Sequence, residues 1–162
     1  MRRTSTGRVS RAKGFTLVEI LIVVVILGIL AAIVIPRFTD AAGDTERAAF
    51  AASGRSFKES ALRYWLDNGV YLEDSSSGVL PTGFEPYVTE HSWGETPIGG
   101  VWDSELNSFG LTSALGVHFN GQGITRDDAY MVEIDAVVDD GDLFTGGFRK
   151  IAGDRYYFVL AD

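Results

Sequence analysis

The sequence predicts an α+β protein in which a long N-terminal helix, membrane-spanning in its first half, packs against a small C-terminal β-rich domain. Two observations indicate the helix: residues 15–35 are almost wholly apolar, and helix-forming residues with one apolar stripe continue to about residue 67. A third indicates the domain, because residues 68–162 alternate short apolar runs with Gly and Pro. A chain of 162 residues has room for one such domain but not for two large ones.

The composition excludes several classes of function. The formal net charge is −8, and five of the basic residues precede Gly14, so the remainder of the chain is strongly acidic. Binding to nucleic acid through phosphates needs clustered Lys and Arg, and we therefore expect no nucleic-acid partner. The absence of cysteine excludes disulfides, cysteine-ligated zinc and thiol catalysis.

The apolar run of residues 15–35 is long enough to span a membrane, because a helix of about 20 residues covers roughly the 30 Å hydrocarbon core. The basic residues before it predict a cytoplasmic N-terminal end, with the rest of the chain across the membrane. The alternative is a secretory signal peptide, but those have apolar regions of about 7 to 15 residues and a small-residue cleavage site. The run here is longer and lacks such a site, so we expect it to be retained.

Glu19 is the only charged residue in the apolar run. An ionisable group within a span costs a few kcal/mol and needs a partner or a role, although a position near the interface would let it reach water. The surrounding sequence, Lys-Gly-Phe-Thr-Leu-Val-Glu from residue 13 to 19 followed by the apolar run, resembles the processing site of type IV prepilins and type II secretion pseudopilins.

This resemblance implies both processing and assembly. In that family a membrane prepilin peptidase cuts after the glycine that matches Gly14, removing a leader of residues 1–14, and methylates the new N-terminus, here Phe15. The family's glutamate at the fifth mature position matches Glu19, and its proline at the twenty-second matches Pro36. The resemblance therefore assigns assembly roles to Phe15, Glu19 and Pro36.

Elementary electrostatics gives the same pairing a physical basis. Cleavage after Gly14 would remove the five basic residues and leave one α-ammonium at Phe15. If subunits pack side by side with an axial stagger, Glu19 of one subunit can meet the Phe15 ammonium of another, and a low dielectric strengthens that pair. An unpaired Glu19 inside such a bundle would be unfavourable.

The helix is expected to divide into a membrane and polymerisation half, residues 15–36, and an amphipathic half, residues 37–67. Pro36 predicts an interruption before the helix resumes, and Gly43 and Gly54 could loosen it. The apolar stripe of the second half consists of Phe50, Phe57, Ala61, Tyr64 and Trp65. Residues 67–69, Asp-Asn-Gly, are a stop signal.

In the globular domain, residues 68–162, we expect strands or hairpin arms at 95–103 and 113–119, and a C-terminal hairpin of 149–151 with 155–160. Residues 70–77 and 80–88 are expected to be loops with brief extended pieces. Residues 127–138 alternate as a strand would, but their apolar residues also fit a helix. Thr125 and Asp128 have the spacing of a capping box, which favours the helix.

The acidic turn near the C-terminus is the candidate for metal chemistry. Asp139, Asp140 and Asp142 surround Gly141, with Asp135 just before them, and such oxygen ligands suit Ca²⁺, although the spacing is not that of an EF-hand. A solvated acidic turn is the alternative. Some pseudopilins bind calcium in a C-terminal loop, so the resemblance keeps the calcium hypothesis open without assigning the ion to any residue.

No catalytic residue is predicted. His91 and His118 have no Ser or Asp nearby in the sequence that suggests a triad or a metal motif. Trp65, Trp93 and Trp102 could form a platform for stacking a sugar, but packing is the more common use of aromatic residues.

The favoured function is a structural fibre subunit, either a type II secretion pseudopilin or a closely similar type IV pilin. Its partners would be other pilin-like subunits in a homo- or hetero-polymer, prepilin peptidase and an inner-membrane assembly platform. It would lie in the inner membrane as a single-pass protein with a periplasmic C-terminal domain, and enter a periplasmic or surface fibre. The lack of cysteine and a mature length of 148 residues favour the pseudopilin.

The alternative is a periplasmic binding module or enzyme that uses the span only as a membrane tether. A tether of this kind has no use for the Glu19 carboxylate, whereas polymerisation requires it.

Overall fold

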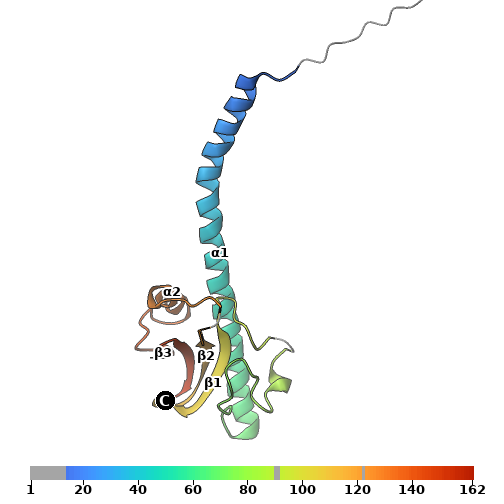
Figure 1. Ribbon diagram of the computed structural model, residues 1–162. Helices are drawn as coiled ribbons and strands as arrows, with labels where there is room; N and C mark the ends of the chain where they lie inside the picture. Colours follow the sequence, from blue (N-terminus) through green and yellow to red (C-terminus); the bar gives the residue numbers. More distant parts are fainter. Residues whose placement is uncertain (1–13, 90–91, 122) are drawn as a thin grey trace, which may run out of the picture. The chain divides into compact units, whose positions relative to one another are not determined.

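The structure is a computed structural model that describes residues 14–89, 92–121 and 123–162, without the side chains of residues 36–40. Two compact units divide it between Ala41 and Ala42, and each is described by itself. Figure 1 shows the elements along the chain. They are, in order, α1 (Leu17–Asn68), a 3-10 helix η1 (Glu85–Tyr87), β1 (Val101–Ser108), β2 (Leu111–His118), α2 (Asp128–Val138), β3 (Phe148–Ala152) and β4 (Arg155–Ala161).

Helix α1 is one α-helix of 52 residues. The predicted interruption near Pro36 is wrong, because the helix continues through this residue. A proline removes a single backbone donor, and the turns on either side can hold the helix through that local loss. The predicted stop is confirmed, since the helix ends at Asn68 and Gly69 follows with φ +73°.

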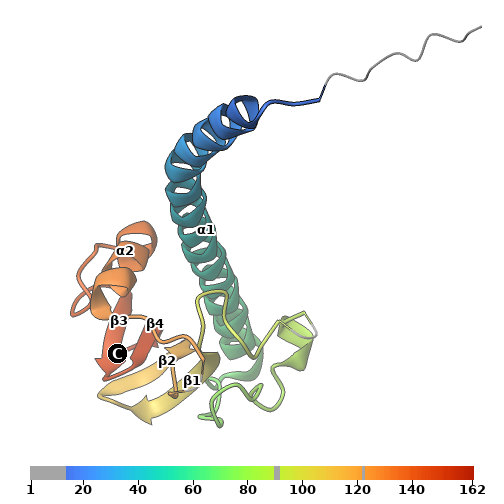
Figure 2. The same ribbon diagram turned by 45° about the horizontal axis from the view of Figure 1, so that its top comes forward.

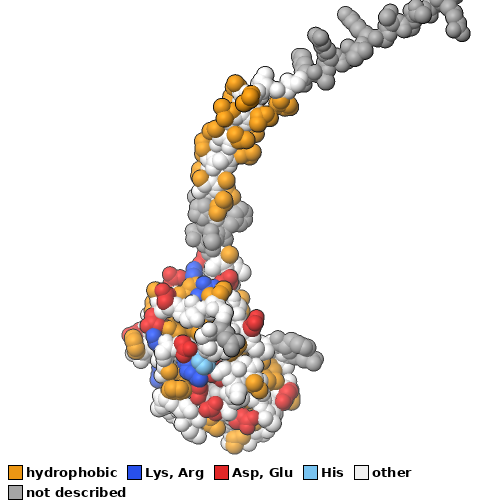
Figure 3. Space-filling view, in the orientation of Figure 1, with side chains coloured by type: hydrophobic (Ala, Val, Ile, Leu, Met, Phe, Trp, Pro, Cys, Tyr) orange, Lys and Arg blue, Asp and Glu red, His pale blue; other side chains and the backbone are white. Residues whose placement is uncertain are grey.

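The first unit contains the apolar part of α1. Leu17–Ile35 has a mean hydropathy of 3.3 and is long and apolar enough to cross a membrane. Figure 3 shows hydrophobic side chains on the surface of this part of the helix, and none of the segment is buried inside the protein. Such a surface needs lipid or other helices to cover it.

The second unit contains a four-stranded antiparallel sheet in the order β1-β2-β4-β3, which lies beside the second half of α1 (Figures 1 and 2). The predicted strand at 113–119 and the C-terminal hairpin are confirmed with slightly different ends. The prediction for 95–103 is largely wrong, because the strand runs from Val101 to Ser108. Residues 97–98 form a turn instead. Gly99 and Gly100, which follow it, have φ of +91° and +69°, values that favour glycine.

The core forms where the apolar stripe of α1 meets one face of the sheet. Phe50, Phe57 and Ala61 are buried as predicted, and the Phe50 ring stacks on the Trp102 ring with centroids 5.1 Å apart. Tyr64 packs at the edge of this core. Trp65 does not join it, because it is 38% exposed and stacks on Tyr71 instead.

Gly54 has a packing role in place of the predicted loosening. A Cβ atom at this position would lie 2.1 Å from the ring of Phe158 on β4, so only glycine lets the helix approach the sheet this closely. Neither Gly54 nor Gly43 interrupts the helix.

The ambiguous segment 127–138 forms α2, which confirms the helix prediction. The predicted cap is wrong: the N-cap is Asp127, whose side chain accepts a hydrogen bond of 3.0 Å from the Tyr130 backbone N–H, and Thr125 lies outside the helix. The guanidinium groups of Arg47 and Arg126 lie 5.0 and 4.4 Å from the centre of the Tyr130 ring. The Arg47 contact ties α2 to α1, because Arg47 lies on α1 and Tyr130 on α2.

Candidate functional site

The N-terminus of α1 is closed by a reciprocal pair of hydrogen bonds. Glu19 Oε2 accepts from the backbone N–H and from the Oγ1 hydroxyl of Thr16, each at 2.7 Å, and the Glu19 N–H donates to Thr16 Oγ1 at 3.2 Å. This is a capping box, with Thr16 at the N-cap and Glu19 at the third helical position. The sequence reasoning gave Glu19 a role between subunits and missed this role within the chain, although the Thr-x-x-Glu spacing is a signal for it.

The residues before the cap are accessible. Gly14 lies outside the helix, and a Cβ atom there would meet no atom of the described residues within 4 Å; Phe15 is 81% exposed. A peptide bond here can enter a protease cleft in an extended form. The hydrogen bonds within the cap use Oε2 of Glu19, and a carboxylate has four lone-pair sites, so the group can accept a further cation. The Pro36 side chain lies outside the described residues, so its predicted role is not located.

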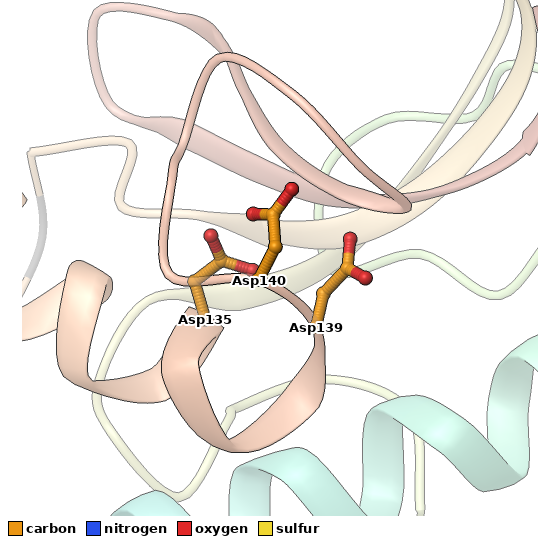
Figure 4. A group of neighbouring side chains, drawn as sticks. All are labelled: Asp135, Asp139 and Asp140. Carbon is orange, nitrogen blue, oxygen red and sulfur yellow. The ribbon is translucent and has the colours of Figure 1, made fainter.

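A second site forms where α2 ends. One carboxylate oxygen from each of Asp135, Asp139 and Asp140 lies within 4.8 Å of the other two, and Figure 4 shows the three side chains gathered at the end of the helix. We call these three residues the acidic cluster. Asp142, the third ligand predicted from the sequence, lies outside it and accepts a hydrogen bond from the Phe144 N–H at 3.0 Å.

Asp135 is the unusual member of the acidic cluster. It is fully buried, on the same face of α2 as Met131 and Ile134, and neither of its carboxylate oxygens makes a hydrogen bond to the described residues. Burial chiefly, together with the charges of Asp140 and Asp139, raises the pKa of Asp135 to about 6. The Gly141 N–H lies near enough to oppose this shift in part without forming a hydrogen bond. A buried carboxylate without partners is unfavourable unless a cation or a proton neutralises it.

The other two carboxylates of the cluster order the loop after α2. Asp139 Oδ2 accepts from the N–H groups of Gly147 and, at 3.4 Å, Phe148. Asp140 Oδ2 accepts from the Thr145 hydroxyl at 2.8 Å. A Cβ atom at Gly146 would lie 1.9 Å from Asp139 Oδ2, so the loop can close over this carboxylate only with glycine there. The loop thus brings oxygen ligands toward Asp135.

His118 has polar neighbours that the sequence did not indicate. Its Nδ1 lies 2.7 Å from Ser77 Oγ, and its Nε2 lies 3.5 Å from Asp154 Oδ2. Both neighbours are distant from His118 in sequence, so no local sequence pattern signals them. The Ser77 hydroxyl also donates to Asp103 Oδ2 at 3.0 Å, so His118 and Asp103 share one hydroxyl. His91 lies outside the described residues.

The three tryptophans do not make a shared platform for stacking. Trp102 is buried in the core, Trp93 packs against that core, and Trp65 stacks on Tyr71 away from both. Packing is the role the structure gives them.

Comparison with known proteins places the match at the N-terminus of α1. Residues 9–35 match the family model described as the prokaryotic N-terminal methylation motif. This range contains the Gly14-Phe15 junction, the Thr16–Glu19 capping box and the whole apolar segment. The motif and the exposed apolar helix therefore coincide.

Longer relatives extend the similarity into the globular unit. The chain is 30% identical over 134 residues to the type IV major pilin protein PilE1 of Neisseria gonorrhoeae, covering 72% of this chain and 61% of that protein. It is 32% identical over 105 residues to the fimbrial protein EcpC of Eikenella corrodens, covering 64% and 68%. It is 55% identical over 98 residues to the type IV narrow pilus major component PilA5 of Thermus thermophilus, covering 60% and 75%. The chain thus spans about three fifths of the gonococcal relative, and no solved structure gives a significant match.

Proposed function

We propose that this chain, which belongs to the family of type IV pilin-like proteins, is a membrane-anchored fibre subunit that polymerises through the first half of α1. The observation that carries the proposal is the coincidence, within residues 9–35, of the methylation motif with an exposed apolar helix that holds a single carboxylate. In this proposal residues 1–14 are a leader, 15–36 the polymerisation segment, 37–67 the amphipathic half of the helix and 68–162 the periplasmic domain.

The proposed assembly has an order set by charge. Before cleavage, the basic residues of the leader hold the N-terminal side in the cytoplasm. Prepilin peptidase then cuts after Gly14 and methylates Phe15, leaving one ammonium close to the helix start. A neighbouring subunit, moved along the fibre axis, brings its Glu19 to this ammonium while the apolar surfaces of the two helices cover each other. The pair is strong because the bundle has a low dielectric.

Glu19 has two roles in this proposal, and they can be separated. Glutamine at the third helical position also completes a capping box, so Glu19→Gln keeps the cap and removes the charge. Thr16→Ala does the reverse, since it removes the N-cap at about 0.5–2 kcal/mol and leaves the carboxylate. We expect cells that express Glu19→Gln to contain processed subunit but few or no fibres, and cells that express Thr16→Ala to form fibres.

For both variants, electron microscopy of sheared fibres measures fibre formation, and immunoblots of membrane fractions measure the amount of processed subunit. Normal fibres from Glu19→Gln would mean that the carboxylate serves only the cap, and the chain would then be a tethered module with no use for a paired charge. Loss of the Thr16→Ala fibres with retention of the Glu19→Gln fibres would give the same conclusion.

Two kinds of fibre are compatible with this assembly. The names of the relatives, a major pilin and a narrow pilus major component, support a type IV pilus. The alternative is a type II secretion pseudopilus, whose subunits share the processing site that the sequence of residues 13–19 resembles. Surface fibres seen by electron microscopy in cells without overexpression would support the pilus, while loss of a secreted enzyme on deletion of this subunit would support the pseudopilus.

We also propose that the acidic cluster binds Ca²⁺. The buried, unpartnered Asp135 carboxylate supports this, because it lacks a compensating charge or donor within the described residues. Carboxylate oxygens that lie within 4.8 Å of one another suit the Ca²⁺–oxygen distances of about 2.3–2.6 Å. Asp135, Asp139 and Asp140 would hold the ion, and its charge would offset their mutual repulsion. The loop that Asp139 and Asp140 already order would then be fixed to α2.

Calcium binding can be tested by thermal unfolding of the full chain in detergent micelles. An ion that binds only the folded state stabilises it by about 2.7 kcal/mol at a hundredfold excess over Kd. We expect Ca²⁺ to raise the melting temperature relative to a chelator in the native chain and in Asp142→Asn, whose side chain lies outside the cluster. We expect no such rise in Asp135→Asn. A melting temperature of the native chain that is the same in Ca²⁺ and chelator would refute the site.

A further inference from the structure

A polar pocket lies on the face of the sheet opposite to the core. Asp103 and Glu105 on β1, and Arg155 on β4, alternate along their strands with core residues such as Trp102 and Tyr156, so they project to the other face. The serine-rich loop of residues 74–77 and the β1–β2 turn complete a pocket of about 510 Å³. This volume can hold one or two sugar-sized rings.

The charged groups at the base of the pocket are held rigidly. Asp103 is only 2% exposed, and its Oδ2 accepts from Tyr157 Oη at 2.6 Å, Arg155 Nη1 at 2.9 Å and Ser77 Oγ at 3.0 Å. The same Arg155 nitrogen donates to Glu105, which is 6% exposed. Buried ionic groups of this kind do not rearrange freely, because breaking one pair leaves another charge uncompensated. The pocket is therefore preorganised.

The network leaves polar groups available to a ligand. Every side-chain hydrogen bond that Arg155 makes to the described residues uses Nη1, so the donors on Nε and Nη2 are not engaged by them. Asp74 and Ser76 line the pocket with exposed side chains. The pocket thus offers donors from a guanidinium, an acceptor from a carboxylate, and a hydroxyl that does both.

Phe109, at the rim of the pocket, has an exposed aromatic ring and a positive backbone φ. Phe109 has φ +54°, which is uncommon for a bulky residue and costs on the order of 1 kcal/mol. The strain does not serve the core, because the ring is 53% exposed. Its ring instead lines the pocket and lies 5.5 Å from the Arg155 guanidinium carbon. The positive φ itself belongs to the two-residue β1–β2 hairpin, because Gly110 also has a positive φ (+80°) and tight hairpin turns of this type need it at both positions. The feature that indicates binding is the exposed aromatic ring beside the pocket.

We propose that this pocket binds a saccharide ring. A sugar has adjacent hydroxyls that both donate and accept, which matches a guanidinium beside a carboxylate and a hydroxyl, and it has an apolar C–H face that can stack on Phe109. An anion such as phosphate is disfavoured by the carboxylates of Asp74, Asp103 and Glu105. A simple ammonium has donors only, so it cannot satisfy the N–H groups of Arg155, and Asp103 already has its Oδ2 saturated.

The proposal is independent of fibre formation and is tested on the full chain in dodecylphosphocholine micelles, whose detergent carries no sugar. The probes are the methyl α-glycosides of glucose and galactose and free N-acetylglucosamine, titrated while backbone amide shifts are followed by NMR. We expect at least one probe to bind saturably with Kd on the order of 1 mM, the range for a one-ring ligand. The amides of Ser76, Phe109 and Arg155 should shift, and those of the acidic cluster should not.

Phe109→Asn separates binding from folding. Asparagine tolerates positive φ, so this variant should be at least as stable as the native chain while its affinity falls about tenfold or more through loss of the stacking surface. Phe144→Ala is the matched control, since Phe144 is 79% exposed and lies outside the pocket, and it should bind normally. The proposal fails if none of the three probes binds at concentrations on the order of 50 mM, if Phe109→Asn binds unchanged, or if inorganic phosphate or propylammonium shifts the same amides at lower concentration than the sugars do.

Discussion

Thr16 and Glu19 cap α1 through three hydrogen bonds in which one carboxylate oxygen accepts both the N–H and the hydroxyl of the same threonine. The pair fixes the first helical turn one residue after Phe15. Because the cap holds Glu19 in place before any neighbour arrives, the side-chain entropy lost on forming an ion pair between subunits is reduced. The cap and the proposed pair therefore support each other.

Processing should leave Phe15 as the first residue, with a methylated amine. Gly14→Leu introduces a branched side chain where the peptidase must accept extended backbone, and we expect it to leave the leader attached. Mass spectrometry of the N-terminal peptide checks this, with Thr16→Ser as a control that keeps the N-cap and should be cut normally. An N-terminus at Met1 in the native chain, or one after Ala31 or Ala32, would contradict the proposed cleavage.

Gly54→Ala should destabilise the globular unit, because its new Cβ would overlap the Phe158 ring. Overpacking of a core costs about 1–3 kcal/mol, and the better helix propensity of alanine offsets less than about 1 kcal/mol of this. Thermal unfolding followed by circular dichroism measures the change. Gly43→Ala is the control: its Cβ would lie 3.6 Å from the Arg47 side chain, an ordinary contact, so it should be neutral or stabilising. Equal stability of the two variants would show that helix and sheet are less closely packed than the structure indicates.

The fold was predictable from the sequence where a repeating pattern reflects burial. The spacing of Phe50, Phe57 and Ala61 identified the buried face of α1, because a helix returns to the same face every three or four residues. Most of β1 was missed because it includes three consecutive polar residues, Asp103 to Glu105, which are buried by polar partners rather than by apolar ones. Composition alone does not reveal partners that come from distant strands and loops.

The candidate sites were predictable only where their residues are close in sequence. The motif from Gly14 to Glu19 and the pair Asp139 and Asp140 could be identified directly. Asp135 was noticed as part of the acidic run, but its burial follows from its position beside Ile134 on the inner face of α2. Ser77 meets His118 from 41 residues away, a contact that depends on how the loop crosses the sheet.

Asp127→Ala should weaken α2 and leave the sheet intact. The substitution removes the hydrogen bond to the Tyr130 N–H, and loss of an N-cap costs about 0.5–2 kcal/mol. Amide hydrogen exchange should be faster in the first turn of α2 and unchanged in β2. Asp127→Ser, which can still cap the helix, should exchange as the native chain does. A native exchange pattern in Asp127→Ala would contradict the assignment of Asp127 as the cap and leave Thr125 as the alternative.

Without calcium, ionisation of Asp135 should lower the stability of the native chain relative to Asp135→Asn as pH rises from about 4 to about 6. The Asp135 carboxyl has a pKa raised from 3.8 to about 6 in the folded state, chiefly by burial. In this window the folded chain holds a proton that the unfolded chain has released, so raising the pH favours unfolding. The shift corresponds to a loss on the order of 2–3 kcal/mol, complete above the folded pKa. Denaturant unfolding of the full chain in micelles with a chelator, at several pH values, measures this loss.

The control variant is Asp135→Asn, which has no proton to lose at this position. The part of the pH dependence of its unfolding free energy that comes from Asp135 should be absent, so it should be the more stable chain at pH 7 in chelator. In saturating Ca²⁺ the order should reverse, because the ion stabilises the ionised carboxylates only in the native chain. A native chain whose stability in chelator rises from pH 4 to pH 6 in parallel with Asp135→Asn would mean that Asp135 is ionised at an ordinary pKa and has a partner in the folded protein.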